Sequence, residues 1–166
     1  MPKREKDIVA VLCNVRSALN VGSMFRTADA AGISKIYLTG YTPAPTDRFG
    51  RKVHEIHKTA LGAENFVPWE HKTNTTALLK KLKADGYEIC AIEQSKKSLS
   101  LNRYKASGPT VLIVGNEVRG LQGTVLKRAD KILEIPMMGK KESLNVSVAF
   151  GVVAFFIAFS NTKTRQ

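Results

Sequence analysis

Arginine, asparagine and serine side chains gather in one stretch near the start of the chain, NVRSALNVGSMFR (residues 14–26). An apolar run precedes the stretch, and the spacing of its apolar residues predicts a helix over residues 21–31. Asn20 is the predicted N-cap, and at about 100° per residue Arg26 points away from the packed face. Backbone N–H groups at the helix start and this guanidinium could together hold an anion. Taken alone, a capped helix with a solvent-facing arginine explains the stretch equally well.

A second stretch, TVLIVGNEVRGL (residues 110–121), runs from an apolar strand into Gly115, Asn116 and Glu117. Glycines directly after a parallel strand let a ligand come close to the backbone at the carboxyl edge of the sheet. The stretch is not GxGxxG, and the chain contains no GxxxxGK[ST]. The usual dinucleotide and phosphate-loop interpretations are therefore weak, and an ordinary turn is the alternative.

The third stretch is EIPMMGKKESLNVSVAFG (residues 134–151), where a strand ends, a loop containing Gly139 follows, and an apolar helix is predicted over residues 144–159. Ser143 is a candidate cap for this helix. Asn145 at the head of so apolar a helix needs hydrogen-bond partners, because an unpaired buried amide costs on the order of a few kcal/mol. A ligand is one candidate partner.

Strand and helix patterns alternate along the chain, and this predicts a single α/β domain over residues 1–166 with a mostly parallel sheet. Several strands are continuously apolar, as expected for strands that helices cover on both faces. The predicted strands are residues 7–13, 35–40, 65–70, 87–93, 110–115 and 131–136. The predicted helices are residues 21–31, 51–61, 75–84, 122–129 and 144–159.

The net charge of +12 on 166 residues favours a polyanionic partner, above all nucleic acid. Two connections, residues 40–58 and 94–109, are longer than packing requires and rich in lysine and arginine. Basic loops with interleaved aromatic residues suit phosphate contacts and base stacking. For any single lysine, a solvated loop tip is the simpler explanation.

Other features narrow the class of protein. Cys13 and Cys90 lie in separate apolar runs, as is usual for buried thiols in a reducing compartment, so we expect a cytoplasmic protein. His54 and His57 have no third ligand at matching spacing, so we expect no metal. The apolar run at residues 144–159 is shorter than a bilayer span, so we expect no membrane contact.

Together the three stretches resemble the motifs of the SpoU/TrmH-type RNA ribose 2′-O-methyltransferases of the SPOUT superfamily. Residues 14–26 resemble motif 1, NxRSxxNxGxxxR; residues 115–121 resemble motif 2, GNExxGL; and residues 135–149 resemble motif 3, IPMxGxxxSLNVSVA. The segment KTALGAE (residues 58–64) is similar to the family's S-A-G-A segment, with Leu61 as a departure. The resemblance covers nearly the whole chain.

The resemblance implies a deep C-terminal trefoil knot, and a homodimer to which the apolar last helix is suited. It also implies S-adenosylmethionine as the cofactor, which would contact motifs 2 and 3 mainly through the backbone. The cofactor-binding residues implied are Gly115, Asn116, Ile135, Met137, Gly139 and Leu144. The reaction implied is in-line transfer of a methyl group from a sulfonium to a ribose 2′-hydroxyl.

A hydroxyl is a poor nucleophile unless its proton is taken or its developing charge is stabilised. Because arginine is always protonated, we expect Arg26 to hold a substrate phosphate and favour alkoxide character, with the phosphate accepting the proton. Asn20 would position the ribose or support Arg26, and Glu117 would anchor Arg16 or Arg26. The catalytic set implied is Asn20, Arg26, Glu117, Ser143 and Asn145; the predicted RNA-binding residues are Arg16, Arg48, Arg51, Lys52 and Lys58.

Three alternatives stay open on the sequence alone. A non-catalytic RNA-binding module would explain the charge without needing motifs 2 and 3. A dinucleotide-dependent oxidoreductase lacks its glycine fingerprint here, and a base rather than a ribose could be the methyl acceptor.

No appended RNA-binding domain is expected, so RNA affinity must come from the basic loops, from dimerisation or from an accessory protein. Transfer RNA is slightly favoured over ribosomal RNA, because a small dimer can grip a compact RNA.

Overall fold

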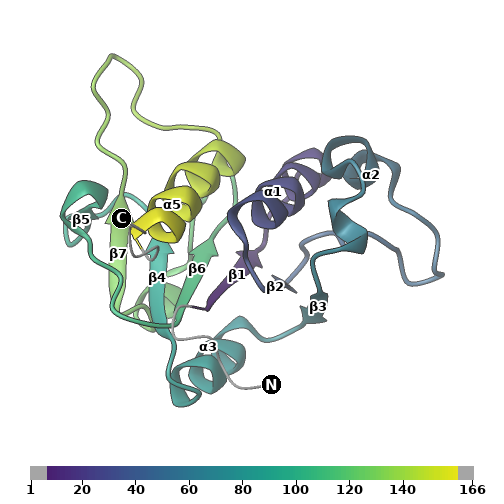
Figure 1. Cartoon of the computed structure of the whole chain (residues 1–166), viewed down its shortest axis with the longest axis horizontal. Helices are drawn as coiled ribbons and strands as arrows, with labels where there is room; N and C mark the ends of the chain where they lie inside the picture. Colours follow the sequence, from purple (N-terminus) through teal and green to yellow (C-terminus); the bar gives the residue numbers. More distant parts are fainter. Residues whose placement is uncertain (1–6, 161–166) are drawn as a thin grey trace, which may run out of the picture.

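Seven parallel strands form one sheet in the computed structural model, which describes residues 7–160 (Figure 1). Their order is β3-β2-β1-β6-β4-β7-β5. The strands are β1 (Ile8–Cys13), β2 (Lys35–Thr39), β3 (Trp69–Lys72), β4 (Glu88–Ile92), β5 (Leu99–Ser100), β6 (Thr110–Val114) and β7 (Lys131–Glu134). The prediction of an α/β fold with a parallel sheet is confirmed. The outermost parts of the predicted domain, residues 1–6 and 161–166, lie outside the described residues.

Helices cover both faces of the sheet, as predicted. They are α1 (Ala18–Ala31), α2 (His54–Ala60), α3 (Thr75–Ala84), α4 (Gly123–Leu126) and α5 (Val146–Ser160). Alternate side chains of β1 pack against the helices on opposite faces of the sheet. Leu12 packs in the core cluster that holds Phe25 of α1 and Phe150 of α5, whereas Val11 packs in the cluster that holds Leu79 of α3 and the α4 side chains. This two-sided burial explains why the strand sequences are apolar without alternation.

The sheet has a switch point between β1 and β6. These two strands are direct neighbours, with Leu12 level with Val114. The chain leaves β1 towards α1 on one face and leaves β6 towards α4 on the other. Open α/β sheets place their ligands at the carboxyl ends of such strands. The first two motif stretches follow directly after β1 and β6, so the topology brings them together.

Three helices begin two or three residues away from their predicted starts. Helix α1 begins at Ala18, because Ser17 is the N-cap and its hydroxyl accepts a hydrogen bond from the Asn20 N–H at 3.2 Å; the prediction of Asn20 as N-cap is wrong. Helix α5 begins at Val146, and Asn145 rather than Ser143 stands in the capping position, so Ser143 as cap is also wrong. Helix α2 is shorter than predicted, since residues 46–52 form a hairpin instead.

The remaining differences are shifts and additions. Strand β3 lies later than predicted because Ala63–Asn65 form a 3-10 helix, η1. The basic connection over residues 94–109 contains strand β5 and a second 3-10 helix, η2 (Leu101–Arg103). Helix α4 is shorter than its predicted range, whereas α3 has the predicted bounds.

Helices α1 and α2 pack closely at Gly22. A Cβ at this position would collide with the Thr59 hydroxyl and the Ile56 carbonyl oxygen of α2. The Thr59 hydroxyl also donates a hydrogen bond to the Leu19 carbonyl in the first turn of α1 at 2.9 Å. The segment at residues 58–64 therefore has a clear role, which is to support the N-terminal half of α1.

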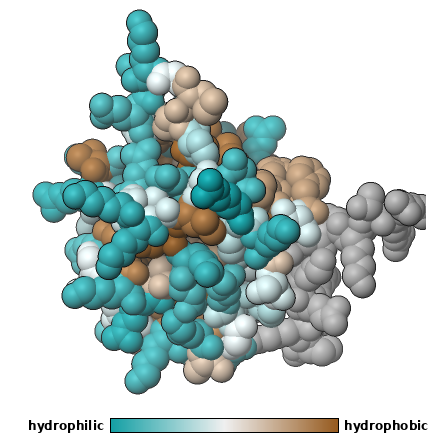
Figure 2. All heavy atoms as spheres, turned by 90° about the vertical axis from the view of Figure 1, so that its left-hand side faces the viewer, coloured by the Kyte–Doolittle hydropathy of each residue, from teal (hydrophilic) through white to brown (hydrophobic). Residues whose placement is uncertain are grey.

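The segment between β7 and α5, which contains the third motif, stands out from the body of the molecule (Figure 1). The face that bears β5 and β7 is largely hydrophilic, with apolar side chains gathered near its middle (Figure 2). Among residues 7–160, no helix is long and apolar enough to cross a membrane. The C-terminal trefoil knot stays a prediction.

Candidate active site

Glu117, directly after β6, is the centre of a hydrogen-bond network at the start of α1. Its carboxylate accepts hydrogen bonds from the backbone N–H groups of Arg16 and Ser17, each at 2.9 Å, and from the Asn20 side chain at 3.1 Å. Partial burial opposes ionisation of Glu117, but these hydrogen bonds outweigh it and hold the pKa of the carboxyl below its usual value. Glu117 is therefore an anion at the positive end of a helix.

This geometry specifies one expected contact. We expected Glu117 to anchor Arg16 or Arg26, and it holds Arg16 through the backbone N–H. The carboxylate thus fixes the chain between β1 and α1 rather than a guanidinium. The exposed side chain of Arg16 is left available for a ligand.

Asn145 joins the third motif to the same network. Its amide donates a hydrogen bond to the Asn20 Oδ1 at 3.2 Å, and its Oδ1 accepts from the N–H and the hydroxyl of Ser147 at 2.8 and 2.6 Å. Asn145 therefore caps α5 and at the same time touches α1. The hydrogen-bonded series Glu117–Asn20–Asn145, hereafter the motif bridge, connects segments that lie about a hundred residues apart. The partners that we expected Asn145 to need are supplied by the protein itself.

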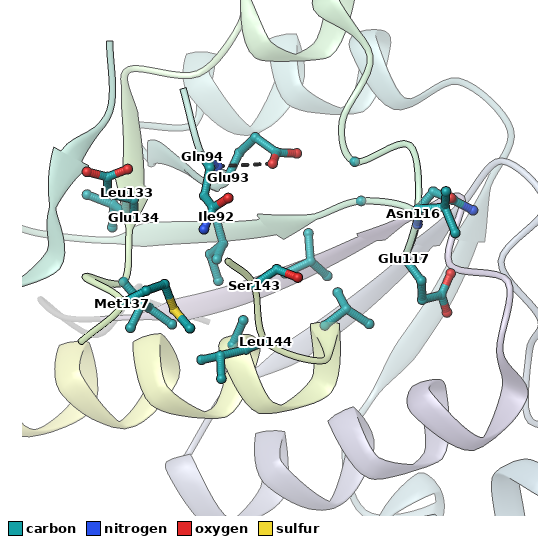
Figure 3. Close-up of a pocket in the computed structure, with 17 residues that line it drawn as sticks. Ile92, Glu93, Gln94, Asn116, Glu117, Leu133, Glu134, Met137, Ser143 and Leu144 are labelled. Carbon is teal, nitrogen blue, oxygen red and sulfur yellow. Dashed lines mark hydrogen bonds between the residues drawn. The ribbon is translucent and has the colours of Figure 1, made fainter. Parts of the chain in front are cut away.

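A cavity of about 260 Å³ lies beside the motif bridge, between the ends of β4, β6 and β7 and the start of α5. In Figure 3, Met137, Ser143 and Leu144 lie across the cavity from Ile92 at the end of β4, and Glu117 lies at its side nearer α1. The walls combine apolar side chains with carboxylates. The ends of β4 and β7 contribute Ile92, Glu93, Leu133 and Glu134 to these walls, and motif 3 contributes Ile135 and Leu144.

Most of the residues predicted to bind the cofactor line this cavity. They are Gly115, Asn116, Ile135, Met137 and Leu144, together with Glu117 and Ser143 from the predicted catalytic set. Gly139 does not line it, and an added Cβ at this position would meet nothing within 4 Å.

The side chain of Asn116 has a structural role. Its amide donates to the Asn14 carbonyl and to the Tyr41 hydroxyl, both at 3.1 Å. Its Oδ1 accepts from the N–H groups of Val118 and Arg119 at 2.9 Å. The side chain thus ties the ends of β1, β2 and β6 together, and Asn116 can offer a ligand mainly its backbone.

The end of β4 was missed as part of the site. Glu93 accepts hydrogen bonds from the N–H groups of Leu121 at 2.9 Å and Gln94 at 3.0 Å, and so holds the turn of motif 2. Gln94 donates to the Glu142 carbonyl at 2.6 Å, which links β4 to motif 3. The signal in the sequence was the pair of polar residues at the end of a buried strand. What the sequence could not show was that β4 lies between β6 and β7.

Arg26 lies on α1, outside the cavity lining. Arg26 is exposed. It follows Asn20 by six residues, so it lies about 9 Å further along the helix axis. The other predicted RNA-binding residues, Arg48, Arg51, Lys52 and Lys58, are exposed on the hairpin before α2 and on α2 itself. The site therefore has an enclosed part at the sheet edge and an open, cationic part on the α1–α2 layer.

Known proteins share this fold and these motifs. The SpoU rRNA Methylase family matches residues 7–155. A tRNA (guanosine(18)-2′-O)-methyltransferase of Aquifex aeolicus is 34% identical over 155 residues, 93% of this chain and 70% of the relative. A 23S rRNA (guanosine-2′-O-)-methyltransferase of Pseudomonas syringae is 32% identical over 148 residues, 89% of this chain and 56% of the relative. The AdoMet-bound structure of an rRNA methyltransferase from Sinorhizobium meliloti has a TM-score of 0.86 at 29% identity and covers 96% of this chain and 59% of that one.

These similarities confirm the predicted family and its enzyme class, the RNA 2′-O-methyltransferases. The bound AdoMet in the Sinorhizobium structure confirms S-adenosylmethionine as the cofactor of this family. The chain spans little more than half the length of the ribosomal RNA relative. With the family model matching residues 7–155, the chain belongs to the SpoU rRNA methylase family.

Proposed function

We propose that this chain transfers a methyl group from S-adenosylmethionine to a ribose 2′-hydroxyl of a structured RNA. The observation that carries the proposal is the motif bridge, Glu117–Asn20–Asn145, at the side of the cavity. It brings the start of α1 and the start of α5 to one place, so a cofactor in the cavity and an RNA on α1 would meet there.

The cavity fits a ligand with an apolar ring and a positive charge. Ile92, Leu133, Ile135 and Leu144 offer apolar walls, and Glu134 lines the cavity with them. Adenine suits such walls, and a carboxylate favours a sulfonium or an ammonium group electrostatically. S-adenosylmethionine, when bound, would supply an electrophilic methyl group on sulfur.

Arg26 is the residue proposed to act on the RNA. As a guanidinium it stays charged, so it can hold a phosphate next to the reacting ribose and stabilise negative charge on the 2′-oxygen. The proton of the hydroxyl would pass to a phosphate oxygen. Asn20 is held between Glu117 and Asn145, so it is fixed for positioning the ribose, while Ser143 faces the cavity from the cofactor side.

Homodimer formation is supported by the outer face of α5. Phe150, Val153, Ala154 and Ile157 are buried on the inner side, yet Val148, Val152 and Phe159 are 50%, 41% and 70% exposed. An exposed apolar stripe on a helix suits an interface between subunits. The Val152→Glu variant should lower the molar mass measured by light scattering from that of a dimer to that of a monomer; an unchanged mass would contradict the proposal.

The RNA class is proposed on similarity and size. The Aquifex relative acts on transfer RNA and is covered over 70% of its length, against 56% for the ribosomal RNA relative. We therefore propose transfer RNA as the first substrate to test, with ribosomal RNA second, and the cytoplasm as the place of action. The exposed basic residues of the hairpin and of α2 would supply affinity, with an accessory protein as the other source.

The test is methyl transfer from S-adenosylmethionine with a labelled methyl group to total RNA, separated into transfer and ribosomal RNA. Wild type should label one fraction, and Arg26→Ala should reduce the rate by about 100-fold or more. Arg128→Ala is the matched control, because Arg128 is exposed next to α4 on the opposite face of the sheet. Equal loss in both arginine variants would contradict the role of Arg26. RNA binding without any cofactor binding would favour a non-catalytic RNA-binding module.

A further inference from the structure

The hairpin between β2 and α2 presents an aromatic ring to solvent. Residues 45–53, hereafter the arginine hairpin, are closed by an antiparallel bridge between Thr46 and Lys52. Phe49 at its tip is 66% exposed and belongs to neither core cluster. A single exposed phenylalanine is ordinary on a protein surface, so the significance of this one depends on its surroundings.

Two guanidinium groups flank the ring. The Cζ atoms of Arg48 and Arg51 lie 4.7 and 5.0 Å from the centroid of Phe49, within cation–π range. The side chain of Arg51 is 73% exposed. The tip therefore combines flat, stackable surfaces with two positive charges, and it remains open to a ligand.

The conformation of the tip is fixed before any ligand arrives. One carboxylate oxygen of Asp47 accepts the N–H groups of Phe49 and Arg51 at 2.8 and 2.9 Å, and the other accepts the Arg51 Nε–H at 2.8 Å. These bonds, the Arg51 backbone first, hold the pKa of Asp47 below its usual value. Gly50 completes the turn with a φ of +77°. Little conformational entropy would therefore be lost when a ligand binds this loop.

The root of the hairpin is anchored to α2. The Pro45 carbonyl accepts the Val53 N–H at 3.0 Å and lies 3.2 Å from His57 Nε2, and the other ring nitrogen of His57 pairs with the buried carboxylate of Glu64. Helix α2 in turn packs on α1 at Gly22. The tip is thus held at a fixed place relative to Arg26 on α1.

We infer that the arginine hairpin docks an unpaired nucleotide of the substrate RNA, away from the methylated ribose. The base would stack on the Phe49 ring or on a guanidinium plane, and Arg48 and Arg51 would hold the adjacent phosphate. An unpaired nucleotide is favoured over a duplex, because the faces of paired bases are already stacked. The inference rests on the proposed function for the RNA, but the hairpin lines no part of the cavity, so it is a second contact.

The test compares Phe49→Ala with Phe66→Ala, a matched control that removes another ring, 74% exposed, from the end of η1. Each variant is titrated into fluorescein-labelled unmodified transfer RNA transcripts, and the Kd is measured by anisotropy at several salt concentrations. Phe49→Ala should weaken binding by about tenfold, with an unchanged salt dependence, since it removes stacking but no charge. Arg48→Ala should reduce the slope of log K against log salt by about 0.7. Phe66→Ala should stay within about twofold of wild type.

A third variant reports stacking directly. Phe49→Trp should keep the wild-type affinity, and its added fluorescence should be quenched when a single-stranded oligouridylate binds. Phe49→Ala binding as tightly as Phe66→Ala, or unquenched Phe49→Trp with RNA bound, would overturn the inference while leaving the proposed methyl transfer intact. Absence of methyl transfer by wild type, together with weakened binding by Phe49→Ala, would instead remove the proposed function and leave the docking site standing.

Discussion

Glu117 and Asp47 are both carboxylates that accept backbone hydrogen bonds, but they act over very different distances in the sequence. Glu117 bonds to residues 97 to 101 positions away, at the start of α1. Asp47 bonds to residues two and four positions away, within the arginine hairpin. The first carboxylate joins two motifs across the sheet edge, whereas the second shapes only its own loop.

The difference shows that the proposed catalytic site and the proposed RNA-binding hairpin depend on different parts of the structure. The proposed catalytic part depends on the whole fold, since the motif bridge exists only when β1, β6 and α5 are all in place. The arginine hairpin depends on local bonds and on its anchor at His57. Disruption of the first should therefore cost stability and activity together, and disruption of the second should cost RNA affinity alone.

The largest effect is expected for Glu117→Gln. The amide keeps the shape but replaces one carboxylate oxygen with an N–H donor, so either the Arg16 N–H or the Ser17 N–H loses its acceptor, and the free energy of unfolding should fall by about 2–3 kcal/mol. Methyl transfer should be lost with it. Urea denaturation measures the first effect, and Glu55→Gln on the exposed side of α2 is the control. A change no larger than that of the control would mean that the network contributes little.

Gly115→Ala should have the next largest effect. A Cβ there would lie 2.5 Å from the Gly120 carbonyl carbon and 2.6 Å from its oxygen, so the backbone of motif 2 would have to move. We expect a loss of about 2 kcal/mol in unfolding free energy and a weaker Kd for S-adenosylmethionine by calorimetry. Gly123→Ala, where a Cβ would meet nothing within 4 Å, is the matched control. Equal unfolding free energies and equal Kd values for the two variants would contradict a close backbone contact at Gly115.

The pH dependence of stability gives a smaller effect with a definite sign. Hydrogen bonds hold the pKa of Glu117 below its ordinary value of 4.5, so the carboxylate stabilises the folded state above that value. This contribution is lost as the pH falls through the lowered pKa. The stability difference between wild type and Glu117→Gln should therefore be full at pH 7 and shrink below about pH 4.5. A difference that stays constant down to pH 3 would argue against an ionised Glu117.

Asp47→Ala should have the smallest effect on stability, because its bonds lie within one exposed loop. The melting temperature should not change measurably. Hydrogen exchange should become faster at the Phe49 and Arg51 amides alone, and RNA binding should weaken. A clear drop in melting temperature would show that the hairpin supports the fold, and Asp47 would then resemble Glu117 rather than contrast with it.

The sequence was sufficient for the fold class and for the clustering of the three motifs. Apolar strands without alternation indicated two-sided burial, and motifs placed after strands indicated the carboxyl edge of a parallel sheet. Local capping was harder to predict. Ser17 and Asn20 are both good N-caps, and the choice of Ser17 follows from Glu117, which binds the Ser17 N–H and the Asn20 side chain from far along the chain.

The parts of the site that were missed depend on spatial neighbours. Glu93 supports motif 2 only because β4 lies next to β6. Local sequence patterns do not predict the order of strands in a sheet. Asn116 was expected to contact the cofactor through its backbone, and the sequence did not show that its side chain bonds to Asn14 and Tyr41, which follow other strands. The arginine hairpin was interpreted as a basic loop, because the sequence did not show the bonds of Asp47 to Phe49 and Arg51.

The most direct test of the central claim identifies the atom that receives the methyl group. RNA labelled by the wild type would be digested to nucleosides and analysed by mass spectrometry, with Glu117→Gln in parallel. The label should be found on 2′-O-methylated ribose and be nearly absent with the variant. Label on a base, or an equal yield of 2′-O-methylated nucleoside from Glu117→Gln, would contradict a ribose methyltransferase site built on the motif bridge.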